Sequence, residues 1–370
     1  MSQTTAQLIS GTSAQSPTFG ATTVTSPNGG QLAGTRNRII NGDMRIDQRN
    51  AGAAVTITAG NIYTVDRWYA FGSVSSKFTV QRSTTAPSGF SHSALITSTS
   101  AYTVGASEEF DFAQYVEGFN AVDLGFGTAS AKSITVSFWV RSSLTGTFGG
   151  AVTNYNSTRS YPFSYTISAA NTFEYKTIVI AGDTSGTWNT DNTIGLNLSF
   201  SLGAGSTKSG TAGAWTAANY PSATGATSVV ATSSATFYIT GVQLEPGTVA
   251  TPFERRSYGQ ELSLCQRYFQ QIGGVSGVPW ALGTLSGYTG SVAAVFFGTL
   301  MRTSPTLNVV GTGFNATDNS LGPVTATVSL NTASNYVGLL EYSHSTLTNN
   351  AARRLLTTNT TSFLQFSAEL

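Results

Sequence analysis

Residues 241–271, GVQLEPGTVATPFERRSYGQELSLCQRYFQQ, combine a strand, a turn and a helix in a chain that otherwise has the sequence of strands and turns. The strand text GVQLE continues ATFYIT and alternates, and a Pro-Gly pair then ends it. Ser257 with Gln260 three positions later predicts a capping box, and a Gly-Gly pair predicts the helix end. One β domain is therefore predicted to close here, before a second begins.

The predicted connecting helix spans residues 257–273 and carries one apolar stripe. Steps of four, three and four residues place the members of the stripe on one face of about four turns. A stripe of this kind suits packing at the axis of an assembly. Its members, the candidates for a trimer axis, are Tyr258, Leu262, Cys265 and Phe269.

Residues 36–256 predict a jelly-roll β-sandwich, because apolar residues alternate with Thr, Ser and Asn between clusters of turn residues. Residues 274–370 predict a smaller β-sandwich, whose final FLQFSAEL alternates to the end of the chain and indicates a paired strand. The predicted fold class is therefore mostly β, with two sandwiches and one helix.

Residues 1–35 are Ser, Thr, Gly, Gln and Asn with single apolar residues, a composition that cannot bury enough surface to order by itself. This segment is either a disordered tail or an arm that orders against a partner. The candidate anchors of such an arm are Leu8, Ile9, Phe19 and Val24.

Only 9% of the 370 residues are charged and the net charge is +1, which does not favour nucleic acid as a partner. No apolar run approaches the length of a membrane helix, so membrane insertion is not expected. The start of the chain lacks the features of a secretory signal, which predicts assembly in a cytoplasm.

Catalytic and metal-binding motifs are absent from the sequence: two histidines and the single Cys265 match no zinc spacing, and no phosphate loop or nucleophile motif occurs. No cofactor is predicted, and metal binding stays open. The acidic cluster Glu108, Glu109, Asp111 and Glu117 has three readings: a solvated strand, a calcium site, or a pair of carboxylates for glycoside hydrolysis. Alternation places Glu109 and Asp111 on one strand face.

Aromatic residues in two loops are candidates for a saccharide platform, because sugar rings stack on aromatic faces. Trp188 lies in SGTWNTDN and Tyr155 in TNYNST. Asn189 and Asp191 are the neighbouring groups that could bond sugar hydroxyls. The alternative is that each ring packs over its own loop.

Several ordered segments between residues 36 and 270 together resemble tailed-bacteriophage and prophage virion proteins of the tail fibre or minor tail kind. They are RNRIINGDMRIDQRNAG (36–52), YTVDRW (63–68), AKSITVSFWVRSS (131–143), AGDTSGTWNTDN (181–192) and FYITGVQLEPGTVATPFERRSYGQELSLCQRYFQ (237–270). Within them, Asn41-Gly42 predicts a turn and Asp66-Arg67 predicts an ion pair.

This resemblance implies a trimeric virion appendage with a jelly roll similar to a carbohydrate-binding module. It also implies an N-terminal arm that attaches to other virion proteins, and a distal C-terminal domain that meets saccharide on the host surface. No catalytic motif is carried over from the family, so no enzyme is expected. The alternatives are a capsid decoration or head fibre, a free lectin-like module, and a glycosidase or depolymerase.

Overall fold

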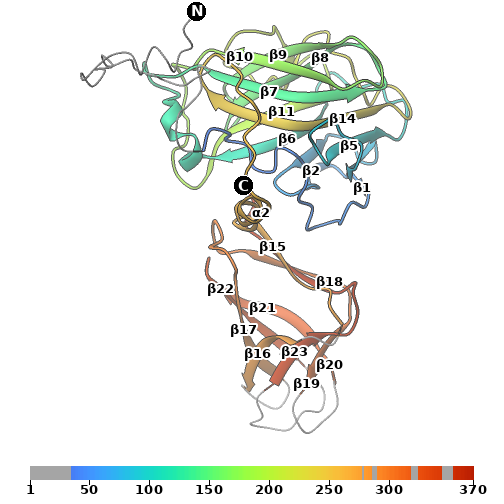
Figure 1. Ribbon diagram of the computed structural model, residues 1–370, viewed down its shortest axis with the longest axis vertical. Helices are drawn as coiled ribbons and strands as arrows, with labels where there is room; N and C mark the ends of the chain where they lie inside the picture. Colours follow the sequence, from blue (N-terminus) through green and yellow to red (C-terminus); the bar gives the residue numbers. More distant parts are fainter. Residues whose placement is uncertain (1–34, 277–278, 286–289, 318–323, 344–352) are drawn as a thin grey trace, which may run out of the picture.

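The computed structural model describes residues 35–276, 279–285, 290–317, 324–343 and 353–370. Two six-stranded sheets pack face to face in a β-sandwich, and one short helix leads from it into a smaller β domain (Figure 1). The predicted mostly-β fold, a jelly-roll-type sandwich followed by a helix and a second β unit, is confirmed. The arm candidates Leu8, Ile9, Phe19 and Val24 lie outside the described residues.

The first sheet, sheet A, is antiparallel throughout and contains the strand that closes the sandwich. The strand predicted from ATFYITGVQLE is β14 (Thr236–Pro246), and it lies between β5 (Ser93–Ser98) and β7 (Ile134–Ser142). The strand order is β1 (Val55–Thr56), β4 (Phe78–Ser83), β5 (Ser93–Ser98), β14 (Thr236–Pro246), β7 (Ile134–Ser142) and β10 (Glu174–Ile180).

The second sheet, sheet B, is also antiparallel. Its order is β2 (Gly60–Tyr63), β3 (Tyr69–Gly72), β6 (Glu109–Glu117), β11 (Ile194–Ala204), β8 (Gly146–Asn154) and β9 (Ser160–Ile167). Two 3-10 turns, η1 (Gly118–Asn120) and η2 (Val122–Leu124), follow β6, and a parallel pair, β12 (Ser209–Gly210) and β13 (Ser222–Ala223), lies in the loop after β11.

The sandwich core fills the space between the two sheets, because alternate residues of each strand point inward. Phe138 from β7 of sheet A meets Phe200 from β11 of sheet B edge to face, with ring centroids 4.9 Å apart. Trp68 stacks on Phe112 at 4.9 Å. The residues between these inward positions face outward. The outward faces of the two sheets are therefore the surfaces open to ligands.

Helix α2 (Tyr258–Gln266) begins as predicted but is shorter than predicted. Ser257 is its N-cap and accepts a hydrogen bond from the Gln260 amide at 3.3 Å. The helix does not reach residue 273, because Phe269–Gly273 forms strand β15 and pairs with the C-terminal strand. Pairing between strands distant in sequence therefore overrides the helical spacing.

The apolar stripe predicted for this helix is not a single exposed face. Cys265 and Phe269 are buried in the chain's own interior, Leu262 is half-buried, and only Tyr258 is exposed. Cys265 packs with Ile40 in a small cluster between the helix and the start of the sandwich. Cys265 and Phe269 are therefore not available to a trimer axis, which corrects that part of the expectation.

The smaller domain has a three-stranded and a seven-stranded sheet (Figure 1). The strand predicted at the C-terminus is present, as β24 (Phe363–Ser367) lies between β15 and β18 (Thr306–Val310). The seven-stranded sheet runs β20 (Val324–Thr325), β19 (Phe314–Thr317), β23 (Arg353–Thr357), β16 (Pro279–Leu285), β17 (Gly290–Phe296), β22 (Val337–Ser343) and β21 (Thr327–Ala333).

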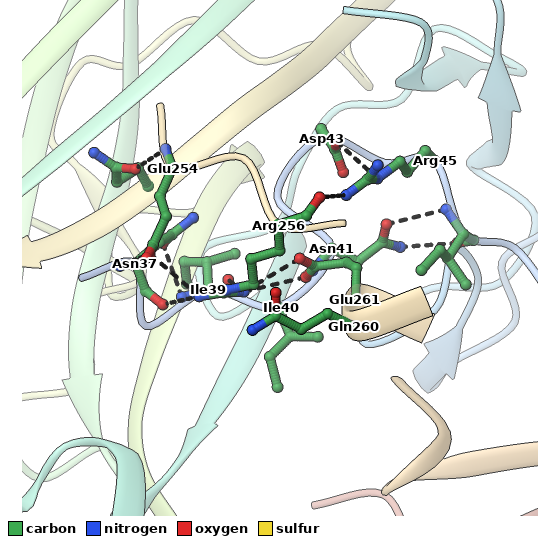
Figure 2. A network of polar contacts seen from close by, with 12 residues as sticks. Asn37, Ile39, Ile40, Asn41, Asp43, Arg45, Glu254, Arg256, Gln260 and Glu261 are labelled. Carbon is green, nitrogen blue, oxygen red and sulfur yellow. Dashed lines mark hydrogen bonds and ion pairs between the residues drawn. The ribbon is translucent and has the colours of Figure 1, made fainter. Parts of the chain in front are cut away.

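The N-terminal strap, residues 37–46, is held to the sandwich and to α2 by one buried arginine (Figure 2). Arg256 donates hydrogen bonds to the carbonyl oxygens of Asn37 and Ile39 and pairs with Glu261 at 3.2 Å. Glu261 also accepts from the Asn41 amide at 2.5 Å. The Asn41-Gly42 turn is confirmed, with Asn41 in the left-handed region at φ 55°.

Arg67 is paired with the far end of the chain and not with Asp66, so the predicted ion pair within this dipeptide is wrong. The Arg67 guanidinium contacts the Glu369 carboxylate and lies over the Tyr268 ring, 3.5 Å from its centroid. Asp66 instead accepts a hydrogen bond from the Gln48 amide at 2.9 Å. The C-terminus therefore returns to the junction between the domains, as Figure 1 also shows.

Within the described ranges, no helix has the length and apolar character needed to cross a bilayer.

Candidate functional site

The outward face of sheet B is hollowed into a cavity of about 250 Å³, which we call the sheet B trough. It is near the lower end of the size range of small-molecule sites, roughly 300–1,000 Å³. Its lining comes from five of the six strands and from two loops. The lining residues are Asn61, Tyr69, Phe71, Glu109, Asp111, Tyr115, Thr153, Asn154, Tyr155, Ser157, Asn197, Ser199, Asn219 and Pro221.

Tyrosine and asparagine side chains form the floor at one end of the trough, because they occupy outward positions on neighbouring strands. Tyr69 and Tyr115 stack with ring centroids 4.5 Å apart. The Tyr69 hydroxyl donates to Asn197 Oδ1 at 3.1 Å, and the Asn61 amide donates to the Tyr115 hydroxyl at 3.2 Å. These contacts hold the rings and amides in place before any ligand arrives.

Asp111 lies in the trough with one carboxyl oxygen that has no hydrogen-bond partner among the described residues. The residue is only 5% exposed, and burial, reinforced by the nearby charge of Glu109, raises the pKa of this carboxyl well above its ordinary value. The Thr153 hydroxyl is likewise buried and unpartnered within the same described part of the chain. Buried polar groups without partners cost about 1–3 kcal/mol each, so a ligand that pairs with them recovers that cost.

The acidic cluster of the sequence is divided among three places. Glu109 lines the trough beside Asp111, as predicted from alternation, and pairs with Lys208 at 3.0 Å. Glu108 closes a turn by accepting from the Tyr102 hydroxyl at 2.9 Å. Glu117 lies at the domain junction, paired with Arg267 at 2.6 Å. Only two of the four acids therefore face a cavity.

A calcium or other metal site in the acidic cluster receives no support, since no group of three or more His, Cys, Asp and Glu side chains in the described part of the chain is arranged to hold an ion.

Tyr155 is the one sequence-predicted saccharide candidate that lies in the trough. It is in the turn between β8 and β9, with 42% of its surface exposed. Asn154 fixes this turn, because its side chain accepts from the Arg159 amide at 3.0 Å and donates to the Thr187 carbonyl oxygen at 3.1 Å. The Tyr155 ring is thus presented at the rim of the trough by a rigid turn.

Trp188 and Asn189 line a different, mostly apolar cavity of about 230 Å³ beside η2. Trp188 packs edge to face against Phe126 at 4.8 Å and Trp215 at 5.4 Å, and its indole N–H donates to the Ser185 carbonyl oxygen. The ring therefore packs against aromatic rings from two other loops while its N–H bonds its own loop, so it is used in packing and is not presented to the trough.

Asp191 is exposed, and the hydrogen bonds that it accepts from the Thr193 hydroxyl and from the Thr193 backbone N–H lower its pKa. It lines neither of these two cavities. The structure does not bring Tyr155 together with the other three candidates.

Sequence reasoning missed Tyr69, Tyr115, Asn197 and Thr153, which form most of the trough floor. Asn197, for example, occupies an outward strand position between the core residues Leu196 and Leu198. An aromatic or amide on the polar face of an amphipathic strand was the signal available. These residues could have been identified from the sequence by considering the outward face of each strand as well as the core face.

No family model and no curated protein sequence matches the chain. Its fold is similar in part to solved structures. The enzymatically active domain of tailspike protein 4 from bacteriophage CBA120 aligns over 57% of this chain and 21% of its own length, with 12% identity and a TM-score of 0.31.

Two saccharide-binding structures also align. A family 11 carbohydrate-binding module from Clostridium thermocellum, in complex with a β-1,3-1,4-mixed-linked tetrasaccharide, aligns over 55% of this chain and 100% of its own, with 14% identity and a TM-score of 0.27. A xylan-binding domain from Paenibacillus barcinonensis aligns over 54% and 99%, with 10% identity and a TM-score of 0.24. Similarity at this level does not identify a ligand.

Proposed function

We propose that this chain is a non-enzymatic saccharide-binding protein that uses the sheet B trough. The observation that carries the proposal is the joint presence of fixed aromatic rings, amide groups and the unpartnered oxygen atoms of Asp111 and Thr153 in one cavity. A sugar has an apolar C–H face and a polar edge of hydroxyls. It can therefore stack on a ring such as Tyr155 while its hydroxyls pair with the floor.

The biological setting we propose is a bacteriophage virion, in which the protein is an appendage that contacts glycan on the host surface. This rests on the sequence resemblance of residues 36–270 to tail fibre and minor tail proteins. Residues 1–35 would dock on other virion proteins, and the appendage would be a homotrimer. Placement on the capsid, and a free lectin-like module, remain the alternatives within the same binding function.

Binding is tested by affinity electrophoresis of the full chain through gels that contain mixed-linked β-glucan, xylan or galactan. Retardation by at least one polysaccharide is expected. Tyr155→Ala should weaken it about tenfold, which corresponds to a contact worth about 1.4 kcal/mol. The matched control is Tyr336→Ala, since Tyr336 is also exposed but lies in the smaller domain. No retardation in any gel, or equal loss in both variants, contradicts the proposal.

A second candidate function, glycoside hydrolysis, is favoured by the pair Glu109 and Asp111. The two residues are two positions apart on one strand face, and their environments differ: Lys208 pairs with Glu109, while burial raises the pKa of Asp111. A proton donor beside an ionised carboxylate is the arrangement that glycosidases use.

Hydrolysis is tested by incubating the protein with the same polysaccharides and measuring the release of reducing ends. Release that disappears in Glu109→Gln and Asp111→Asn would establish the enzyme. Retardation in gels without any release would leave binding as the function.

A further inference from the structure

A second aromatic cavity lies on the outward face of sheet A, the opposite side of the sandwich from the trough. It is open, has a volume of about 500 Å³, and we call it the sheet A groove. One wall consists of Trp139 on β7 and Tyr175 on β10, which are paired across the two strands with ring centroids 5.5 Å apart. Tyr175 is 45% exposed.

The other wall of the groove is formed by two loops that meet through aromatic rings. Phe90 and Phe253 pack edge to face at 5.2 Å. Arg255 extends over both of them, 4.7 Å from the centroid of Phe90, and donates one hydrogen bond to the Gly89 carbonyl oxygen at 2.6 Å. This wall therefore holds a positive charge in a fixed position at the edge of the groove.

The floor of the groove is kept open by a glycine in a β-bulge. Gly241 interrupts the register of β14 against β7 and has φ 62°, in the left-handed region that favours glycine. A Cβ atom at this position would lie 2.7 Å from the Phe90 ring and 3.2 Å from Trp139. The absence of a side chain lets the two walls approach the same strand.

Polar groups in the groove have unused hydrogen-bonding capacity. Within the described residues, none of the Trp139 indole N–H, the Tyr175 hydroxyl and the Ser137 hydroxyl makes a hydrogen bond, and all three residues line the groove. A purely apolar ligand would leave these groups unpaired, at a cost of about 1–3 kcal/mol for a buried one. A ligand with an apolar face and a hydroxylated edge satisfies them.

Among the described residues, the one charged group that lines the groove is the cation Arg255, and the Asp43 carboxylate, which is paired with Arg45, also feels its charge. Arg255 forms no ion pair with any described carboxylate, and neither does Arg141, which lies two positions along β7 from Trp139 and 5.0 Å from the Tyr238 ring. The nearby Glu245 is fully buried and is occupied by hydrogen bonds from Gln243 and Thr251. The trough differs, since its charged lining groups are the carboxyls Glu109 and Asp111.

We propose that the sheet A groove is a second saccharide site and that its ligand is an anionic sugar, carrying a carboxylate or a phosphate. The sugar ring stacks on Trp139 and Tyr175, its hydroxyls pair with the free polar groups, and its acidic group pairs with Arg255. The carboxylate of a uronic acid and the phosphate of a phosphorylated sugar share this chemistry, because a guanidinium binds both. The site does not depend on the function proposed for the trough.

The test uses affinity electrophoresis of the full chain through gels that contain polygalacturonate, hyaluronate or phosphomannan. At least one of these is expected to retard the protein, and the retardation should weaken as salt screens the charge. Arg255→Gln and Tyr175→Ala should each reduce it about tenfold. Polygalacturonate and hyaluronate carry carboxylates and phosphomannan carries phosphate on sugar rings, so the gels distinguish the two sources of charge.

Several controls decide the outcome. Tyr336→Ala should retain the retardation, and the melting temperatures of all variants should show that they fold. Loss of retardation in Tyr155→Ala, but not in Arg255→Gln, would move the anionic ligand to the trough and overturn the proposal. Absence of retardation in all three gels would also overturn it. A change in molecular mass on Tyr175→Ala, measured by light scattering, would show instead that the groove is an interface between copies of the chain.

Discussion

Asp111 is a carboxyl group whose charge state is set by its surroundings and not by its intrinsic acidity. Its side chain is buried, Glu109 lies two residues away on the same strand face, and Lys208 pairs with Glu109. Burial and the neighbouring negative charge both favour the protonated form. A protonated Asp111 can donate a hydrogen bond to a sugar oxygen, which an ionised carboxylate cannot do.

Binding in the trough is therefore expected to depend on pH through Asp111. Because its pKa in the folded protein is raised, the proton donor is present below that pKa and is lost as pH rises through it. Asp111→Asn keeps a donor of similar size at every pH, so this variant should bind within about threefold of the wild type at low pH and show a flat profile. Titration calorimetry from the ordinary Asp pKa of about 4 up to the highest pH at which the protein stays folded measures the difference. A wild-type affinity that is constant over this range would contradict the role of Asp111.

Helix α2 is short, and its start is stabilised by a single side chain. Nine residues are too few for a stable isolated helix, so its N-cap and its packing against the strap carry its stability. Glu261 in its first turn also bonds the strap through Asn41. The element thus connects the strap to the smaller domain.

Ser257→Ala is expected to lower the free energy of unfolding by about 1 kcal/mol, because it removes the acceptor for the Gln260 amide. The matched control is Ser263→Ala, since Ser263 is exposed within the same helix and bonds only the Gly259 carbonyl oxygen. Alanine favours helix there, so the control should be neutral or slightly stabilising. Urea unfolding followed by circular dichroism compares the two. Equal losses would indicate that the cap contributes nothing.

At the scale of the whole molecule, the last residues of the chain bind back to the sandwich. Glu369 pairs with both Arg49 and Arg67, and Arg67 also donates to the Tyr115 carbonyl oxygen at 2.7 Å. Arg302 of the smaller domain donates to the Glu369 carbonyl oxygen at 2.7 Å. These contacts join the sandwich to the last residues of the chain, so the two domains are expected to unfold together.

Glu369→Gln tests this coupling, because it leaves the buried Arg67 without a counter-ion. Breaking one partner out of a buried ion pair typically costs about 3–5 kcal/mol. We expect a loss of that size in the free energy of unfolding, with one cooperative transition in the wild type. Glu341→Gln serves as the control, since Glu341 is exposed on β22. Two separate transitions in the wild type would show that the ends do not couple the domains.

Assembly is a property that one chain cannot display, and the trimer stays a prediction from the resemblance. Light scattering after size-exclusion chromatography should give about three times the chain mass of 38.6 kDa. The contact surface must be other than Cys265 and Phe269, which are buried within the chain. A mass equal to one chain would favour the lectin-like module over the virion appendage.

The sequence by itself determined the local structure. Alternation of apolar and polar residues predicted the strands, the Ser257 and Gln260 pair predicted the helix start, and FLQFSAEL predicted the final strand. It also placed Glu109 and Asp111 on one face. These features depend on periods of two residues or on contacts within one turn, which can be read from neighbouring residues.

Only the tertiary structure decided which strands lie side by side, and therefore which outward residues share a cavity. It separated Tyr155 from Trp188, ended the helix at Gln266 and paired Arg67 with Glu369. It also brought Trp139, Tyr175 and Arg255 into one groove. The reason is physical: these contacts join residues far apart in sequence, and they form because the two sheets must bury their apolar faces against each other.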